Sequence, residues 1–239
     1  MEEYIKALQH LIGNGCPNTA QIYFFGLEEK GDIKNDEPER IKFYKDEYSK
    51  LQNKDSFWTC IINKLYEKEP KIYENDKRNS NIQTYAAYCN IYNSIFNKSF
   101  TTDEFFENSI KENSDVFIGN INWIPRPNNS LLTKSELKSF KEKRLPLVIK
   151  FIDKYVKDYE EKIFIIFGNY RRKEKMEIMN PWKEVEKSPS NQGSTRTISL
   201  AQNQNKHYTN LYWTYHPAHG WLTEEHQKHY AETIKNNRG

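Results

Sequence analysis

The residues that could do chemistry gather in four short segments of the sequence. These segments are FGLEEKG from Phe25, IGNINW from Ile118, FGNYRRK from Phe167 and YHPAHGWL from Tyr215. Each begins where an apolar run ends. A carboxylate such as that of Glu28 can activate water, the amide of Asn120 offers a donor and an acceptor side by side, and His216 can donate a hydrogen bond to developing negative charge.

Two pairs of histidines raise a different possibility, a metal site. His216 and His219 are three residues apart, and so are His226 and His229, which we expect on an exposed face of the last helix. Histidines at positions i and i+3 of a helix can hold one ion. The pairs have no HExxH pattern and no well-placed carboxylate beside them. We therefore expect no bound metal, and a metal-dependent hydrolase stands as an alternative.

Four apolar runs predict the strands that position these segments. They cover residues 22–25, 116–118, 163–167 and the segment LYWTYHP at 211–217. Apolar residues at helical spacing predict helices at 2–13, over most of 36–112, at 134–158 with an interruption at Pro146, and at 222–235. Residues 196–201 could add a strand. Alternating strands and helices are typical of a three-layer α/β/α sandwich with a central, mostly parallel, four-stranded sheet.

Two helix starts carry capping signals. Thr101 precedes a helical segment and has Glu104 three residues later, the spacing of a capping box. Thr223 precedes the last helix, which has acidic residues in its first turn. In a sheet of this kind, ligands bind at the carboxyl ends of the strands, near the point where the strand order reverses. The four segments are therefore the place to look for a site.

Taken in order, the four segments resemble those of the uracil-DNA glycosylase superfamily. Members of that family have a first strand that ends in Gly-x-Asp-Pro or a variant and a second strand that ends in Asn. Their third strand is very apolar and ends in Gly, and their fourth ends in His-Pro before an intercalating loop. The match covers roughly a fifth of the chain. The helical regions between the segments do not take part in it.

The resemblance implies a role for one residue at each of three strand ends. Glu28 corresponds to the acid that activates or orients the water attacking C1′ of the flipped nucleotide. Asn120, or Asn122 if the register shifts by two, corresponds to the residue that reads the Watson–Crick edge of the base. His216 corresponds to the residue that contacts O2 of the base and stabilises the anionic leaving group.

Further residues would hold the base or the DNA. Trp221 or Leu222 corresponds to the wedge that fills the gap left by the extruded base, although both could instead staple the last helix onto the domain. The other base-binding candidates are Gly26, Leu27 and, as the aromatic that stacks on the base, Phe43 or Tyr44. The candidates for phosphate contacts are His219, Arg171, Arg172 and Lys173.

The activity implied by the resemblance is that of a monofunctional DNA glycosylase, which leaves an abasic site and needs no cofactor. Glu29 stands where the family usually has Pro, and Lys30 stands where some members have Tyr. These departures suggest a remodelled pocket, and the resemblance implies uracil or a modified pyrimidine such as a phage-modified cytosine as the base, in single- or double-stranded DNA. The role that the resemblance implies is DNA repair or antiviral defence. A catalytically inactive DNA-binding module of the same fold is a further alternative.

The composition bounds the class of protein. A length of 239 residues fits a single domain, here with a helical insert at about 36–112. The net charge of +3 permits a basic groove without demonstrating one. Three scattered cysteines argue against a disulfide framework or a zinc ribbon and favour a reduced, cytoplasmic protein. No apolar run approaches the ~20 residues that span a bilayer, so we expect no membrane partner, and we expect a monomer.

Overall fold

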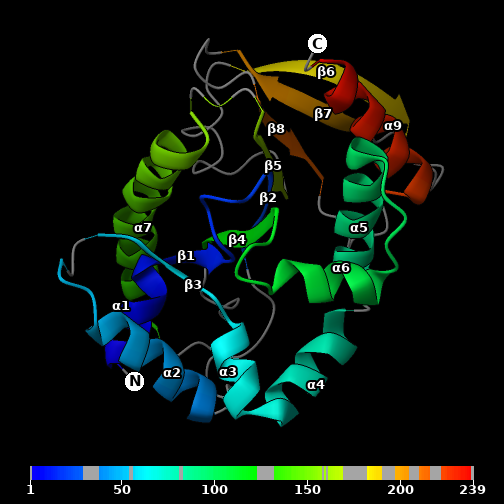
Figure 1. Ribbon diagram of the computed structural model, residues 1–239. Coiled ribbons are helices and arrows are strands. Elements are labelled where there is room, and N and C mark those ends of the chain that lie inside the picture. Colours follow the sequence, from blue (N-terminus) through cyan, green and yellow to red (C-terminus); the bar gives the residue numbers. More distant parts are fainter. Residues whose placement is uncertain are drawn as a thin grey trace.

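The computed structural model of the protein (Figure 1) describes most of the chain. The described residues are 2–28, 38–53, 56–80, 83–122, 132–157, 159, 161–168, 182–189, 197–204, 210–215 and 222–237. The helices are α1 (Glu2–His10), α2 (Pro38–Ser49), α3 (Asn63–Lys68), α4 (Pro70–Ser80), α5 (Gln83–Phe96), α6 (Thr102–Ser109), α7 (Lys134–Tyr155) and α9 (Glu224–Asn236). The strands are β1 (Leu11–Asn14), β2 (Ile22–Glu28), β3 (Trp58–Cys60), β4 (Val116–Asn122), β5 (Ile163–Phe167), β6 (Trp182–Pro189), β7 (Thr197–Asn203) and β8 (Leu211–Thr214).

These strands form one mixed sheet, mostly parallel, in the order β3-β1-β4-β2-β5-β8-β7-β6. The four predicted strands are β2, β4, β5 and β8, and they are adjacent and parallel to one another in the order β4-β2-β5-β8. We call these four strands the parallel block. The α/β class is confirmed. The prediction of a four-stranded sheet is wrong, because the sheet has eight strands within the described residues, with further strands flanking the block on both sides.

The flanking strands are short or polar, which is why the sequence patterns did not reveal most of them. The helix predicted at 2–13 ends at His10, because the next four residues join the sheet as β1. A three-residue strand, β3, interrupts the helical pattern around Trp58. The additional strand suggested at 196–201 is found as β7, which pairs antiparallel with β6 and with β8.

Close contact between β1 and β4 requires glycine. Gly13 of β1 pairs with Gly119 of β4 in the antiparallel register. A Cβ atom on Gly119 would lie 2.7 Å from the carbonyl oxygen of Ile12, closer than real Cβ atoms approach other atoms. The glycine before Asn120 is therefore explained by strand packing and does not depend on a turn.

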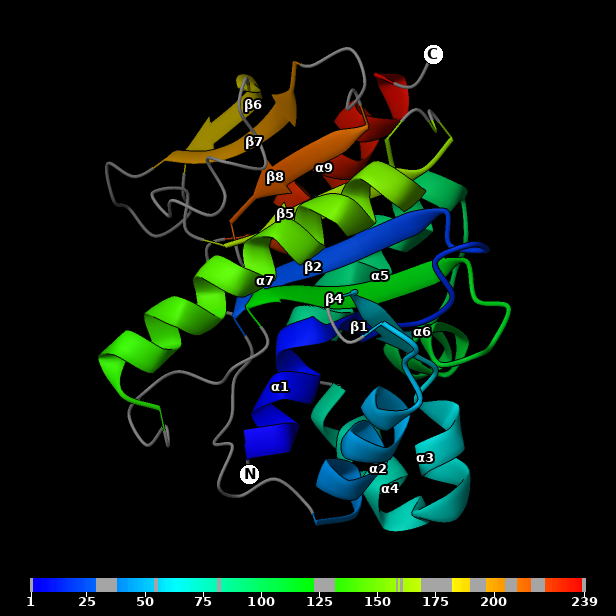
Figure 2. The ribbon, with the colours of Figure 1, turned by 90° about the vertical axis from the view of Figure 1, so that its left-hand side faces the viewer.

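Helices cover both faces of the sheet. α7 lies along one face, and α5, α6 and α9 lie along the other (Figure 1). The helices α1 to α4 gather beside β1 and β3 (Figure 2). The segment from α2 to α6 joins β2 to β4, where a helical insert was predicted, but it also contains β3. No helix in the described ranges is long and apolar enough to cross a membrane.

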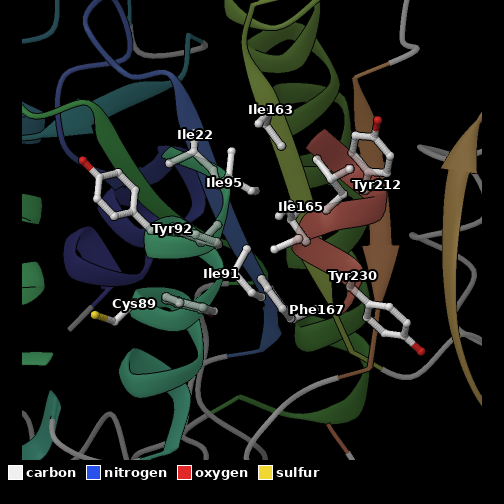
Figure 3. Close-up of a cluster of buried hydrophobic side chains, with 14 of the residues drawn as sticks. Ile22, Cys89, Ile91, Tyr92, Ile95, Ile163, Ile165, Phe167, Tyr212 and Tyr230 are labelled. Atoms are coloured by element: carbon white, nitrogen blue, oxygen red, sulfur yellow. The ribbon is translucent and has the colours of Figure 1, made fainter. Parts of the chain in front are cut away.

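The strands of the parallel block are buried on both faces. Tyr23 and Phe25 of β2 belong to the cluster under α7, which we call the α7-side cluster. Ile22 and Phe24 of the same strand belong to the cluster under α5 and α9, the α5-side cluster, part of which is drawn in Figure 3. This burial explains why the strands are continuous apolar runs without alternation of polar and apolar residues.

Capping boxes fix the starts of three helices. Thr101 and Glu104 exchange hydrogen bonds at the start of α6, and Thr133 and Glu136 do so at the start of α7. Thr223 caps α9, with His226 in the position usually taken by Glu or Gln. The predicted caps at Thr101 and Thr223 are thus confirmed. The helix predicted at 134–158 is found as α7, but the interruption expected at Pro146 is not, because α7 continues through Pro146.

Candidate functional site

One row of residues crosses the parallel block near the carboxyl ends of its strands. The Cα pairing aligns Asn120, Gly26, Phe167 and Thr214. Side chains alternate between the faces of a strand. Phe167 lies in the α5-side cluster (Figure 3), as do Phe24 and Tyr212, which precede Gly26 and Thr214 by two residues. The row, which we call the Asn120 row, therefore faces the α5 side of the sheet.

The strand order reverses between β2 and β5, so β2 borders the switch point. The chain passes from β2 to β4 on one side of the block, and later from β5 to β8 on the other side. Open α/β sheets bind ligands at such a switch point, beyond the carboxyl ends of the strands. One step beyond the Asn120 row, the Cα atoms of Glu28 and Asn122 are paired. The predicted acid and both candidate amides thus belong to adjacent strands that end at the same edge (Figure 2).

Among the described residues, the polar side chains at the two ends of the row have no hydrogen-bond partners. The half-buried amide of Asn120 makes no hydrogen bond within the described residues. Thr214 is 2 % exposed, and its Oγ1 likewise has no partner in the described part of the chain. Buried polar atoms are nearly always hydrogen-bonded, so the hydroxyl of Thr214 and, beside it in the row, the half-buried amide of Asn120 are candidates for ligand contacts. The unpartnered oxygens of Asn14 and Asn63 belong to β1 and α3, outside the parallel block.

Gly168 ends β5 beside the row. Its φ of +150° lies in a region that residues with a Cβ rarely adopt. Its N–H donates to the carbonyl oxygen of Thr214 over 3.0 Å. The glycine after the third predicted strand therefore sets the chain direction at the strand end and ties β5 to β8.

Aromatic rings support the row from the α5 side. The ring of Tyr88 in α5 stacks on Phe24 with a centroid distance of 4.5 Å and lies 5.0 Å from the ring of Phe167. Burial raises the pKa of Tyr88, so its phenol stays protonated. The sequence patterns placed Phe24 and Phe167 in predicted strands and Tyr88 in a predicted helical region. Their place beside the row depends on strand register and on the packing of α5, which the sequence does not show.

The aromatic residues expected to stack on the base, Phe43 and Tyr44, lie in another cluster. This cluster joins α1, α2 and β3, and both side chains are buried in it. The ring of Tyr44 stacks on Tyr4 at 6.3 Å and meets Trp58 edge-on at 6.0 Å. Neither ring belongs to the Asn120 row or to the rings that support it.

Leu222 occupies the position expected of a staple. It is 3 % exposed and belongs to the α5-side cluster, with residues of α5 and α9. Its carbonyl oxygen accepts a hydrogen bond from the buried amide of Gln227 over 2.9 Å. This placement agrees with the alternative in which Leu222 fastens the last helix to the domain, and Trp221 is the remaining candidate for a wedge.

The second histidine pair has structural partners. His226 is 7 % exposed, and its Nδ1 lies 2.7 Å from Oγ1 of Thr223 in the cap of α9. His229 is exposed, and its Nε2 lies 3.2 Å from a carboxylate oxygen of Glu186 in β6. The expectation that both lie on an exposed face is therefore wrong for His226. Over the described ranges, no three His, Cys, Asp or Glu side chains are grouped so as to hold a metal ion.

Several candidate residues lie outside the described residues. They are His216, His219, Trp221, Arg171, Arg172 and Lys173. For Leu27 and Glu28 the strand placement is described, and Gly26 is buried in β2. The geometry therefore bears on the strand ends at Glu28 and Asn120, and the roles of the other residues remain predictions from the sequence. No protein-family model matches the chain, and no curated protein matches it significantly.

Proposed function

We propose that this protein is a DNA glycosylase that flips uracil or a modified pyrimidine out of DNA and hydrolyses its glycosidic bond. One observation carries the proposal. The strand that ends in Glu28 borders the switch point of the sheet, and the strand beside it ends near Asn120, whose amide has no hydrogen-bond partner among the described residues. A carboxylate and an amide on adjacent strand ends suit a site that binds a heterocycle and directs water to the bond beside it.

In the proposed reaction, the chain's own residues supply binding and charge. Asn120 pairs with the Watson–Crick edge of the flipped base. The carboxylate of Glu28 orients a water molecule toward C1′, and its negative charge stabilises the positive charge that develops on the sugar. The bond from C1′ to the base nitrogen breaks, and the base leaves as an anion. His216, the residue after Tyr215, donates a hydrogen bond to that anion. Water then adds its oxygen to C1′ and gives one proton to the carboxylate of Glu28, and this proton finally neutralises the released base.

The DNA is held by residues further along the same segments. Trp221 fills the space that the flipped nucleotide vacates, since the burial of Leu222 suits a structural role. Arg171, Arg172, Lys173 and His219 contact phosphates, which positions the DNA without reading its sequence. Phosphate contacts of this kind weaken as salt is added, so binding should fall steeply with ionic strength.

The proposal is tested by asking whether the purified protein makes abasic sites. Labelled oligonucleotides, single- and double-stranded, would each contain uracil, hypoxanthine, hydroxymethylcytosine or glucosylated hydroxymethylcytosine. Alkali cleavage after incubation reports an abasic site, and chromatography identifies the released base. We expect release from at least one uracil or modified-cytosine substrate. DNA binding without release from any substrate would instead indicate a binding module, and neither binding nor release would exclude both functions.

A further inference from the structure

The end of β4 is held by a fully buried arginine that the sequence patterns did not single out. Arg144 comes from the middle of α7 and is 0 % exposed. Its Nε donates to the carbonyl oxygen of Ile121 over 2.7 Å, and its Nη2 donates to that of Asn120 over 2.7 Å. Its Nη1 donates to the carbonyl oxygens of Leu8 and Gln9 over 2.9 and 3.0 Å. One side chain thus joins the end of β4 to the last turn of α1.

This geometry fixes the backbone at the candidate base-reading residue. Successive carbonyl groups of a regular strand point in opposite directions. At Asn120 and Ile121, two successive carbonyls converge on a single guanidinium group. β1 is paired with β4 at Gly119 and Ile118. Just beyond that pairing, Arg144 supplies the hydrogen-bond donors for the carbonyl groups of β4.

A packing role alone does not account for an arginine at this position. The rest of the inner face of α7 is apolar, with Val148, Phe151 and Ile152 in the α7-side cluster. Burying a guanidinium costs free energy that an apolar side chain would not cost. Carbonyl groups at the end of α1 carry partial negative charge, which offsets part of that cost. In return, the planar fork of donors fixes the direction of several acceptors at once.

We propose that Arg144 is the positioning residue for Asn120. The amide of Asn120 has no hydrogen-bond partner within the described residues, so its direction is set by the backbone that carries it. Arg144 holds that backbone against α1 and thereby aims the amide at the flipped base. This inference rests on the proposed function, because it names the residue that keeps the base-reading group in place. It predicts that Arg144 and Asn120 act as a unit in catalysis.

A double-mutant cycle on the base-release assay tests this coupling. Arg144→Lys keeps the charge but replaces the planar fork with a point donor. We expect the single variant to lower kcat by about tenfold or more, with a smaller change in KM for the DNA. Combined with Asn120→Ala, the same change should lower kcat by less than about twofold, because the group it positions is already gone. Multiplicative effects of the two changes would overturn the inference.

A matched control separates positioning from stability. Lys162→Met removes another buried cation, one that donates to the carbonyl oxygen of Pro17 and to the hydroxyl of Tyr23 at the opposite edge of the block. It should lower the midpoint of thermal unfolding without changing kcat at 25 °C. If Arg144→Lys does not fold, Arg144→Gln takes its place, and failure of both to fold would assign Arg144 to stability alone. Asn120→Ala with full activity would count against the proposed function itself.

Discussion

Two asparagines at opposite ends of the same sheet differ in how their amides are used. Asn210, just before β8, is buried, and its Nδ2 lies 3.1, 2.7 and 2.7 Å from the carbonyl oxygens of Val156, Tyr159 and Lys162. Asn120, near the end of β4, has no such partners in the described chain. At the amino edge of the parallel block, where its strands begin, the amide of Asn210 therefore connects three backbone carbonyl groups that precede β5. At the carboxyl edge, the amide of Asn120 has no hydrogen-bond partner among the described residues, as the proposed role in ligand binding requires.

The largest effect should come from the acid at the switch point. Glu28→Gln should lower the rate of base release by about 10²–10⁴-fold, because an amide cannot take the proton of the attacking water or supply negative charge. DNA binding measured by fluorescence anisotropy should be unchanged or tighter. Glu67→Gln, at an exposed position in α3, is the matched control and should keep full activity. Equal rates for the two variants would remove Glu28 from the mechanism.

Asn120→Ala should separate activity from stability at the carboxyl edge. Loss of the base-reading amide should lower kcat/KM by about 10²–10³-fold, the range seen when a single preorganised donor is removed. The free energy of unfolding, measured by urea titration, should change by less than about 0.5 kcal/mol, since no hydrogen bond within the described protein is lost. A large loss of stability would show that the amide has a structural partner after all.

Asn210→Ala, at the amino edge, should lower stability and leave activity nearly unchanged. Three carbonyl groups lose their donor, so the free energy of unfolding should fall by about 3 kcal/mol or more. The rate of base release at 25 °C, measured on the folded fraction, should stay within about twofold of the wild-type rate. A loss of activity without a loss of stability in this variant would show that Asn210 does not have the purely structural role that distinguishes it from Asn120.

Thr214→Val should make the protein more stable and less active. The buried hydroxyl has no partner in the described residues, and replacing it with a methyl group removes an unsatisfied polar atom. We expect a gain of about 1 kcal/mol in the free energy of unfolding and a loss of about tenfold in kcat/KM if the row extends to the substrate. A gain in stability with unchanged activity would restrict the site to β2 and β4.

The smallest effect on base release should come from alkylation of Cys16, which lies at the amino edge of the sheet. Partial burial alone disfavours the thiolate of Cys16, but hydrogen bonds from Thr19 and Asn18, with Lys162 nearby, outweigh it and lower the pKa of the thiol. Burial raises the pKa of Cys89 to about 11 and raises that of Cys60 further. At a pH just below the ordinary cysteine pKa, more of Cys16 is therefore thiolate.

Brief alkylation followed by peptide mass spectrometry checks this order of reactivity. Cys16 should be labelled several-fold faster than the other two cysteines, and the labelled protein should keep its base-release activity, because Cys16 lies at the other edge of the sheet from Asn120. Faster labelling of Cys60 or Cys89 would show that the clusters around them open readily.

The sequence was sufficient for those parts of the fold that depend on local patterns. Continuous apolar runs located the parallel block, because strands buried on both faces are apolar at every position. Thr101 and Thr223 located two helix starts, because capping requires particular residue types at fixed spacing. β1 and β3 were missed because three or four residues show no periodicity. For the site, the segments gave Glu28 and Asn120. Arg144, Tyr88 and Thr214 are brought to the Asn120 row by strand pairing and helix packing between distant segments, and their own neighbours in the sequence carry no sign of it.

The Asn120 row can form only late in synthesis of the chain. Its members come from residues 26, 120, 167 and 214, and a chain emerges from the ribosome with its N-terminus first. A nascent chain that has reached β5 can pair β4, β2 and β5, but it lacks the strand that supplies Thr214. Pairing between segments so far apart also makes folding slow. The row is therefore completed only when β8 docks on β5, as one of the last steps of assembly.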